Sequence, residues 1–114
     1  MEPALPLINW NDFGKIEIRV GTVLSAEVFK EAKKPAYKIT LDFGPLGRRK
    51  TSAQITKLYT PEEIVGRQVV AVLNFQPKQI ANFISECLIL GVVNGAEVTL
   101  LAPDKQVENG LRIG

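Results

Sequence analysis

The sequence contains no histidine and only one cysteine, Cys87. Histidine is the commonest general base and metal ligand, so its absence removes the usual catalytic and metal-binding arrangements. The carboxylates show no metal-ligand spacing. Glu62 and Glu63 are adjacent, but neighbouring residues on a helix point about 100° apart, and helix capping accounts for Glu63. We therefore expect a protein that is not an enzyme and that uses neither a metal ion nor a cofactor.

Long apolar runs are also lacking, and none approaches the roughly 18 residues that a transmembrane helix needs. Residues 1–6 lack the basic start and the long apolar core of a signal peptide. Cys87 has no partner for a disulfide and stands in an apolar run, which favours a buried structural thiol over a nucleophile. We expect a cytoplasmic protein without membrane insertion.

The 114 residues are enough for one domain, 1–114, that buries a core without a disulfide or metal. The net charge is only +2, but it is unevenly distributed. Residues 30–57 hold eight basic and two acidic side chains, a balance of +6, whereas the remainder holds six basic and ten acidic, a balance of −4. This segregation predicts a basic face that attracts phosphates or acidic peptides. A merely solvated surface is the alternative.

Apolar and polar residues alternate along residues 16–28, which predicts a long strand with one buried face. Gly21 in its middle permits a sharp bend. Further strands are expected at 37–43, 48–54, 69–73, 88–90 and 97–101, with a hairpin turn at Asn94-Gly95 and one more short pairing within 107–113.

Short helices are expected after two capping residues. Asn9 can cap a turn through Trp10 and Phe13, and Thr60-Pro61-Glu62-Glu63 has the pattern of a capping box. The set of elements predicts an all-β protein, an OB-fold five-stranded barrel with short helices. An SH3-like barrel is the alternative.

An unusual connection follows the fourth expected strand. Instead of being wholly polar, residues 76–86 carry Ile80, Phe83 and Ile84. Exposed apolar side chains on a loop mark binding sites, although they could also fold back and plug the barrel. In OB-folds, strands two and three and the loops after strands one and four form the ligand surface. Here these parts are 38–54, 29–35 and 76–86, so the basic segment and the apolar loop are expected on one face.

At this point the sequence resembles a known family. The residues that carry the resemblance are Ile18-Arg19-Val20-Gly21-Thr22-Val23, Pro35-Ala36-Tyr37-Lys38, Asp42-Phe43-Gly44, Ser52-Ala53-Gln54-Ile55-Thr56, Gly66-Arg67-Gln68-Val69, Asn74-Phe75 and Ser85-Glu86. They are similar to the CsaA family, small export-related chaperones within the tRNA-binding domain superfamily, which includes the C-terminal domain of methionyl-tRNA synthetase. The resemblance implies a tRNA-binding-type OB-fold domain at 13–113 and a homodimer, with residues 1–12 as an N-terminal extension contributing to the dimer contact.

The connection 76–86 departs from the family pattern. Gln76, Gln79, Asn82 and Ile84 stand where relatives usually carry proline, a basic residue, glycine and a basic residue, respectively. The segment is therefore more apolar and less basic than in relatives, which favours a polypeptide ligand.

Two functions follow from the residues and the resemblance together. The first is a molecular chaperone that binds unfolded or presecretory polypeptides in protein export, with a site made of Phe75, Ile80, Phe83 and Ile84. The alternative is a structure-selective tRNA-binding protein that uses the same face. In it, phosphates would meet Arg48, Arg49, Lys50 and Lys78, and hydrogen bonds would come from Ser52, Gln54, Asn74 and Ser85. Aromatic residues are few on the second and third strands, so little base stacking is expected.

Apolar residues outside the barrel strands predict a homodimer. They are Leu5, Leu7, Ile8, Trp10, Phe13, Leu111 and Ile113. The alternative is that they cap one end of the barrel within a monomer.

Overall fold

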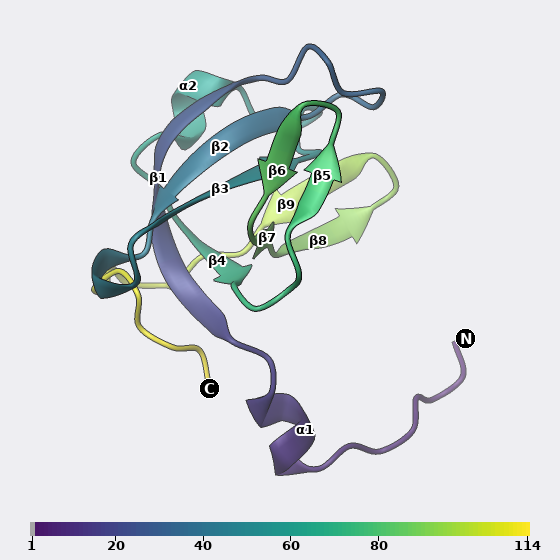
Figure 1. Cartoon of the computed structure of the whole chain (residues 1–114). Helices are drawn as coiled ribbons and strands as arrows, with labels where there is room; N and C mark the ends of the chain where they lie inside the picture. The colour runs from purple at the N-terminus through teal and green to yellow at the C-terminus, as the bar shows by residue number, and fades with distance from the viewer. Residues whose placement is uncertain (1) are drawn as a thin grey trace.

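A computed structural model describes residues 2–114 and contains one five-stranded antiparallel sheet with the order β3-β2-β1-β4-β7. Its strands are β1 (Ile18–Val28), β2 (Tyr37–Asp42), β3 (Arg48–Ala53), β4 (Gln68–Val72) and β7 (Leu88–Ile89). Two hairpins accompany it, β5 (Lys78–Ile80) with β6 (Phe83–Ser85), and β8 (Gly91–Asn94) with β9 (Glu97–Leu100). The helices are α1 (Trp10–Gly14), α2 (Pro61–Ile64) and a 3-10 turn, η1 (Gly44–Leu46) (Figure 1).

The sheet curls into a nearly closed barrel, and hydrogen bonds bridge the gap between its outermost strands, β3 and β7. The Thr51 hydroxyl on β3 donates to the backbone oxygen of Cys87 at 2.6 Å, and the backbone N–H of Glu86 donates to the oxygen of Lys50 at 2.8 Å. A partly open five-stranded barrel is what the OB-fold prediction requires, and the predicted barrel is confirmed.

Strand β1 is long enough to pair with two neighbours. Residues Ile18–Thr22 pair with β4 and Thr22–Val28 pair with β2, with a register shift between Val23 and Ser25. Gly21 precedes Thr22, where these pairings meet, and a Cβ atom on Gly21 would stand 2.6 Å from Cε1 of the buried Phe43 ring. The strand therefore packs against the core at a distance that only glycine allows.

The barrel interior is filled by the alternate residues of its strands. On β2, Tyr37, Ile39 and Leu41 are buried, whereas Lys38, Thr40 and Asp42 alternate with them and remain partly exposed. Ile64 of α2 is fully buried within the same core. The predicted capping box holds this helix, since the Thr60 and Glu63 side chains each accept from the other's backbone N–H. The core contains none of Ile80, Phe83 and Ile84, so these residues do not plug the barrel.

The connection 76–86 differs from the expected loop because it contains the β5–β6 hairpin, closed by Ala81 and Asn82. Ala81 has a φ of 53°, a left-handed conformation that normally signals glycine. The turn therefore carried no recognisable sequence signal. In the other hairpin Asn94 pairs with Glu97, so the turn residues are Gly95 and Ala96, one position later than predicted.

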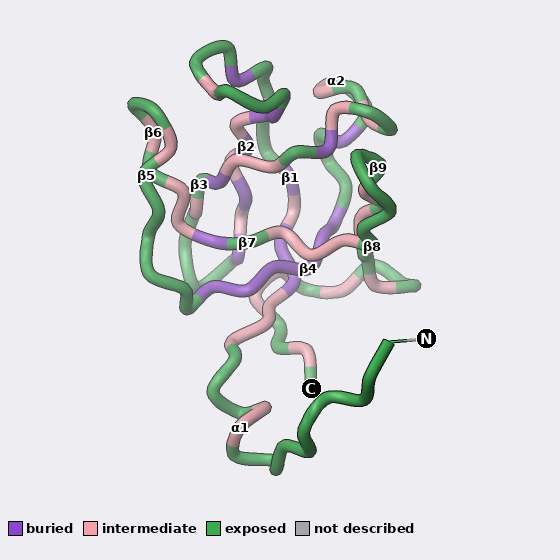
Figure 2. Tube along the Cα trace, turned by 90° about the vertical axis from the view of Figure 1, so that its right-hand side faces the viewer, coloured by how far each residue is buried: buried purple, intermediate pink, exposed green. Residues whose placement is uncertain are grey.

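Both ends of the chain lie outside the barrel. The short pairing predicted within 107–113 is present, and its partner is β1: the N–H of Val20 donates to the backbone oxygen of Leu111, and that of Ile113 donates to the oxygen of Ile18. Asn9 and Asp12 form a capping box at α1. The segment before α1 extends away from the barrel and is exposed throughout (Figures 1 and 2). Within residues 2–114 no helix is long and apolar enough to cross a membrane.

Candidate binding surfaces around the β5–β6 hairpin

The β5–β6 hairpin is fastened to β3 by polar contacts. The Ser85 hydroxyl lies 2.9 Å from the Thr51 hydroxyl and accepts from the N–H of Ser52 at 3.3 Å. The carboxylate of Glu86 accepts from the N–H of Lys50 at 2.9 Å. These bonds satisfy backbone groups of β3 beside the gap in the barrel, and they hold the hairpin against that strand.

The two faces of the hairpin have different environments. Successive strand residues point to opposite sides, and Ile80 pairs with Phe83 while Gln79 pairs with Ile84. Ile80, Phe83, Lys78 and Ser85 therefore share the face that lies toward β3, which we call the inner face. Ile84 lies on the outer face and is 43% exposed. The predicted polypeptide site is thus divided between the two faces.

An apolar hollow of about 830 Å³ lies between the end of β3, the inner face of the hairpin, β7 and the β8–β9 hairpin; we call it the apolar groove. Phe75 and Ile80, both predicted as polypeptide-binding residues, line it. Phe83 and Ile84 do not. Sequence reasoning missed the opposite wall, because the apolar pattern of its residues predicts strands but does not show that they line a hollow. That wall includes Leu88, Leu90, Val93 and Val98.

Polar residues from the predicted RNA set also lie at the apolar groove. Ser52, Gln54, Lys78 and Ser85 are among its lining residues. Cys87 forms part of the wall, and burial raises the pKa of its thiol to about 12, with the Thr51 hydrogen bond acting in the opposite direction. The thiol is therefore protonated and unreactive at neutral pH, as expected of a structural cysteine.

A second hollow, of about 250 Å³, lies on the outward side of β1, β2 and β3; we call it the outer hollow. It shares no lining residue with the apolar groove, so the predicted single face consists of two separate hollows. Its polar residues are Ser25, Glu27, Lys38, Thr40 and Lys50, and the hairpin contributes Phe83.

Aromatic and cationic groups gather at the outer hollow. The Phe83 ring meets the Phe29 ring edge-on, with 5.4 Å between centroids. The ammonium groups of Lys38 and Lys50 lie 5.8 and 5.3 Å from the Phe83 centroid, within the range of cation–π attraction. Lys38 is also 4.0 Å from Glu31. Neither Phe29 nor Lys38 was among the predicted site residues, because nothing in the sequence indicates that the hairpin reaches them.

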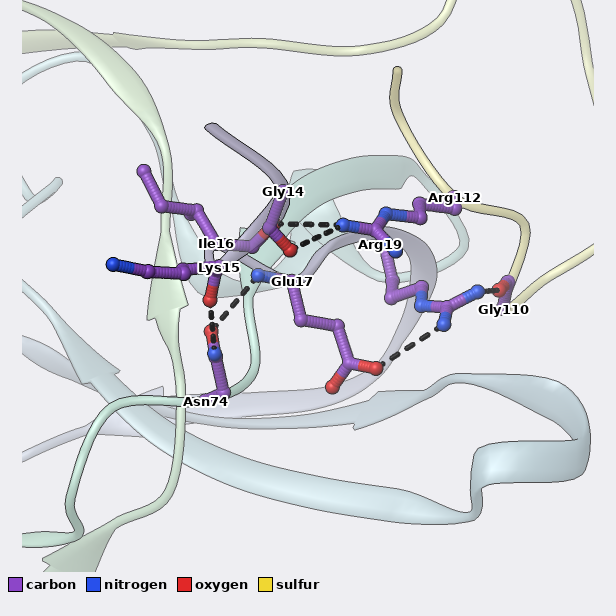
Figure 3. A network of polar contacts seen from close by, with 8 residues as sticks. All are labelled: Gly14, Lys15, Ile16, Glu17, Arg19, Asn74, Gly110 and Arg112. Atoms are coloured by element: carbon purple, nitrogen blue, oxygen red, sulfur yellow. Dashed lines mark hydrogen bonds and ion pairs between the residues drawn. The ribbon is translucent and has the colours of Figure 1, made fainter. Parts of the chain in front are cut away.

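Other predicted RNA-binding residues lie apart from both hollows. Arg48 is exposed at the start of β3, opposite Asp42, and Arg49 donates to the backbone oxygen of Leu46 at 3.0 Å. The amide of Asn74 is engaged with the N-terminal segment (Figure 3): its oxygen accepts from Glu17 N–H at 2.9 Å, and its nitrogen donates to Lys15 at 2.6 Å. Asn74 therefore has a structural role that the sequence did not indicate.

The network in Figure 3 fixes the start of β1 to the chain's C-terminal segment. Arg112 donates to the backbone oxygen of Gly14 at 2.9 Å, and Arg19 donates to Gly110 at 3.1 Å and to Glu17 at 3.1 Å. These bonds orient the segment that leads into α1. Residues 2–114 contain no group of three or more Cys, Asp or Glu side chains that could hold a metal ion.

Comparison with known proteins relates most of the chain to one family. A family model described as a putative tRNA-binding domain matches residues 18–112. The structure of a chaperone CsaA from Bacillus anthracis is 48% identical, with a TM-score of 0.92 over 96% of this chain and 100% of that chain. A CsaA chaperone protein from Picrophilus torridus is 50% identical, with a TM-score of 0.88 over 95% and 100% of the two chains.

Longer proteins match as well. A methionine–tRNA ligase from Methanosarcina mazei is 39% identical over 111 residues, which is 96% of this chain and 15% of the ligase. The chain thus spans less than a fifth of the length of the curated relatives that it matches.

Proposed function

The chain belongs to the CsaA family of the putative tRNA-binding domains, and on that premise we propose that it is a non-catalytic molecular chaperone. In this proposal it binds unfolded or presecretory polypeptides in the apolar groove and acts in the cytoplasm, where such chains occur before export. The observation that carries the proposal is the groove itself, a hollow of about 830 Å³ with apolar walls.

The groove has the chemistry that an unfolded segment needs. Phe75 is 57% exposed, Leu88 47% and Val93 74%, so covering them with apolar side chains removes apolar surface from water. Gln54 and Lys78 supply polar groups among these apolar walls, where they can bond a polypeptide backbone. Such a site selects apolar segments without selecting one sequence.

A binding assay with matched variants tests the proposal. The probe is a permanently unfolded, fluorescein-labelled polypeptide, and its affinity is measured by anisotropy. Phe75→Ser with Ile80→Ser removes two apolar side chains that line the groove. We expect affinity to fall at least about tenfold, which corresponds to a loss of about 1.4 kcal/mol in binding free energy. Ile84→Ser, on the outer face of the same hairpin, is the control and should leave affinity unchanged. Equal affinities of all three proteins would contradict the proposal.

We further propose a homodimer in which residues 1–12 contact the partner and residues 13–113 form the binding domain. Leu5, Leu7 and Trp10 are 86%, 100% and 89% exposed, so they do not cap their own barrel. Exposed apolar residues gathered in one segment are a typical interface signal. Sedimentation at micromolar concentration should give twice the 12.5 kDa chain mass, and Leu7→Ser with Trp10→Ser should give a single chain. A wild-type protein of 12.5 kDa would overturn the dimer.

A second function, binding of tRNA on the outward side of β1–β3, is favoured by a separate observation. Lys50 and Lys38 lie at the outer hollow, Arg48 lies farther along β3, and three exposed lysines, Lys30, Lys33 and Lys34, follow β1. Reversing the charge at Arg48 and Lys50 should weaken tRNA binding and flatten its log–log salt dependence by about 0.7–0.9 for each lost phosphate contact. Reversing Arg49, which is bonded to Leu46, should have less effect. An unchanged slope in the first variant would remove the basis of this function.

A further inference from the structure

We propose that the outer hollow is a pocket for one unpaired nucleotide of an RNA, with its base on the Phe83 ring and its phosphate between Lys38 and Lys50. The proposal rests on the second function above, RNA binding, and specifies the part of the RNA that this surface recognises. It also changes the expectation from sequence that base stacking would be weak.

The hairpin supplies the aromatic platform that β2 and β3 lack. Phe83 belongs to β6 and lies against the outward side of these strands, where it lines the outer hollow. The buried Phe29 holds the ring edge-on, with an angle of 61° between the ring planes. Because Phe29 packs against it, the Phe83 ring is held in place at the outer hollow, where a flat partner can stack on it. Base–aromatic stacking is tolerant of sequence, because every base has a π-face.

The two lysines are placed to receive the phosphate that accompanies a stacked base. Their ammonium groups lie 5.8 and 5.3 Å from the same ring centroid, and that of Lys38 lies 5.1 Å from Phe29. A cation–π contact at an exposed site is weak, so an ammonium group leaves the ring readily when a base arrives. It can then form a charge-assisted hydrogen bond with the phosphate, which is stronger.

The remaining polar groups favour a nucleotide over an acidic peptide side chain. Glu27 lines the hollow and Glu31 is 4.0 Å from Lys38. Their carboxylates repel a phosphate as much as a peptide carboxylate, but they can accept from ribose hydroxyls or exocyclic amines, as can Ser25 and Thr40, and an acidic side chain has no such donors. An acidic side chain would also leave the Phe83 ring without a partner. The hollow therefore combines a stacking surface, two cations and several acceptors, which complement the base, the phosphate and the hydrogen-bond donors of a nucleotide.

The experiment measures the affinity of a fluorescein-labelled single-stranded tetra-adenylate and of whole tRNA over a range of salt concentrations. Phe83→Leu should weaken tetra-adenylate binding about tenfold without changing the salt slope, because stacking is lost and no charge is removed. Phe83→Tyr keeps the ring and should bind as the wild type does. Lys38→Gln with Lys50→Gln should flatten the salt slope by about 0.7 for each lost contact, the value for single strands. Lys57→Gln, which removes a lysine that lines neither hollow, is the matched control and should change nothing.

Three results would contradict the proposal, and each shows which part of it is wrong. If the wild type binds tRNA but Phe83→Leu leaves the affinity for both RNAs unchanged, the nucleotide pocket is overturned and tRNA binding stands. If the wild type binds neither RNA, the second function falls together with the pocket. If polyglutamate binds with the same dependence on Phe83 while tetra-adenylate does not, the hollow is a site for acidic peptides and the proposal is overturned.

Discussion

Serine substitutions at Phe83 and Ile84, two adjacent residues of β6, should have very different effects on stability. Phe83 lies on the inner face, where its ring meets Phe29 and the ammonium groups of Lys38 and Lys50. Ile84 lies on the outer face and is 43% exposed. Because alternate strand residues face opposite sides, Phe83→Ser removes all three of these contacts and Ile84→Ser removes none of them.

The contacts of Phe83 determine how far the two variants should differ in their free energy of unfolding. An edge-on aromatic pair contributes about 0.5–1.5 kcal/mol beyond its buried area, and each cation–π contact at an exposed site about 0.5–1 kcal/mol. We therefore expect Phe83→Ser to lower the free energy of unfolding by about 2–3 kcal/mol. Ile84→Ser should lower it by about 0.5 kcal/mol or less, as is usual for a surface position. For a chain of this length, about 1 kcal/mol corresponds to about 4 °C in Tm.

Thermal unfolding followed by circular dichroism, together with amide hydrogen exchange, measures both effects. The Tm of Phe83→Ser should fall by about 8–12 °C if the hairpin unfolds with the barrel. If the hairpin detaches alone, Tm changes little and exchange becomes faster at residues 78–85. Ile84→Ser should change neither quantity appreciably. Similar losses of protection and of Tm in the two variants would refute the assignment of faces.

Three further predictions concern the barrel and its turns. Gly21→Ala should destabilise the protein by about 1–3 kcal/mol in urea unfolding, because its Cβ would stand 2.6 Å from the buried Phe43 ring; an unchanged midpoint would show that the ring can move aside. Ala81→Gly should stabilise the hairpin by up to about 1 kcal/mol, because it relieves a left-handed alanine, and slower amide exchange at residues 78–85 would report it; faster exchange would contradict this reasoning. Burial raises the pKa of the Cys87 thiol from its ordinary value near 9 to about 12. Between these two pH values the folded protein keeps a proton that the unfolded chain loses, so stability should fall as pH rises from about 9 to 12. Cys87→Ala should lose less stability over that pH range, and parallel losses in the two proteins would contradict the shift.

Local patterns in the sequence were sufficient to predict most of the barrel. The alternation around Ile39 and Leu41 reflects a strand with one buried face, and the capping box of Thr60 and Glu63 is decided within four residues. Such features depend on neighbours in the chain, so they can be read directly. Within the five strands of the barrel the strand ends differed: β1 begins at Ile18 rather than at residue 16, and β4 covers Gln68–Val72.

The candidate sites were harder to predict because they depend on contacts between distant segments. The β5–β6 hairpin was missed because Ala81 takes the place where a turn usually signals itself with glycine. Without the hairpin, the opposite faces of Phe83 and Ile84 could not be known, nor the approach of Phe83 to Phe29. The sequence predicts a polar side chain of Asn74 that is available to RNA, whereas its amide binds backbone groups more than fifty residues away in the chain.

The central claim is that polypeptide binds in the apolar groove and RNA on the outward side of β1–β3. Amide NMR titration of the wild-type protein, first with an unfolded polypeptide and then with tRNA, tests it most directly. We predict that polypeptide shifts the resonances of Ile80, Cys87 and Leu88 but not those of Lys38 and Lys50, and that tRNA does the reverse. Both ligands shifting one common set of resonances, or polypeptide leaving the groove resonances unmoved, would contradict the account.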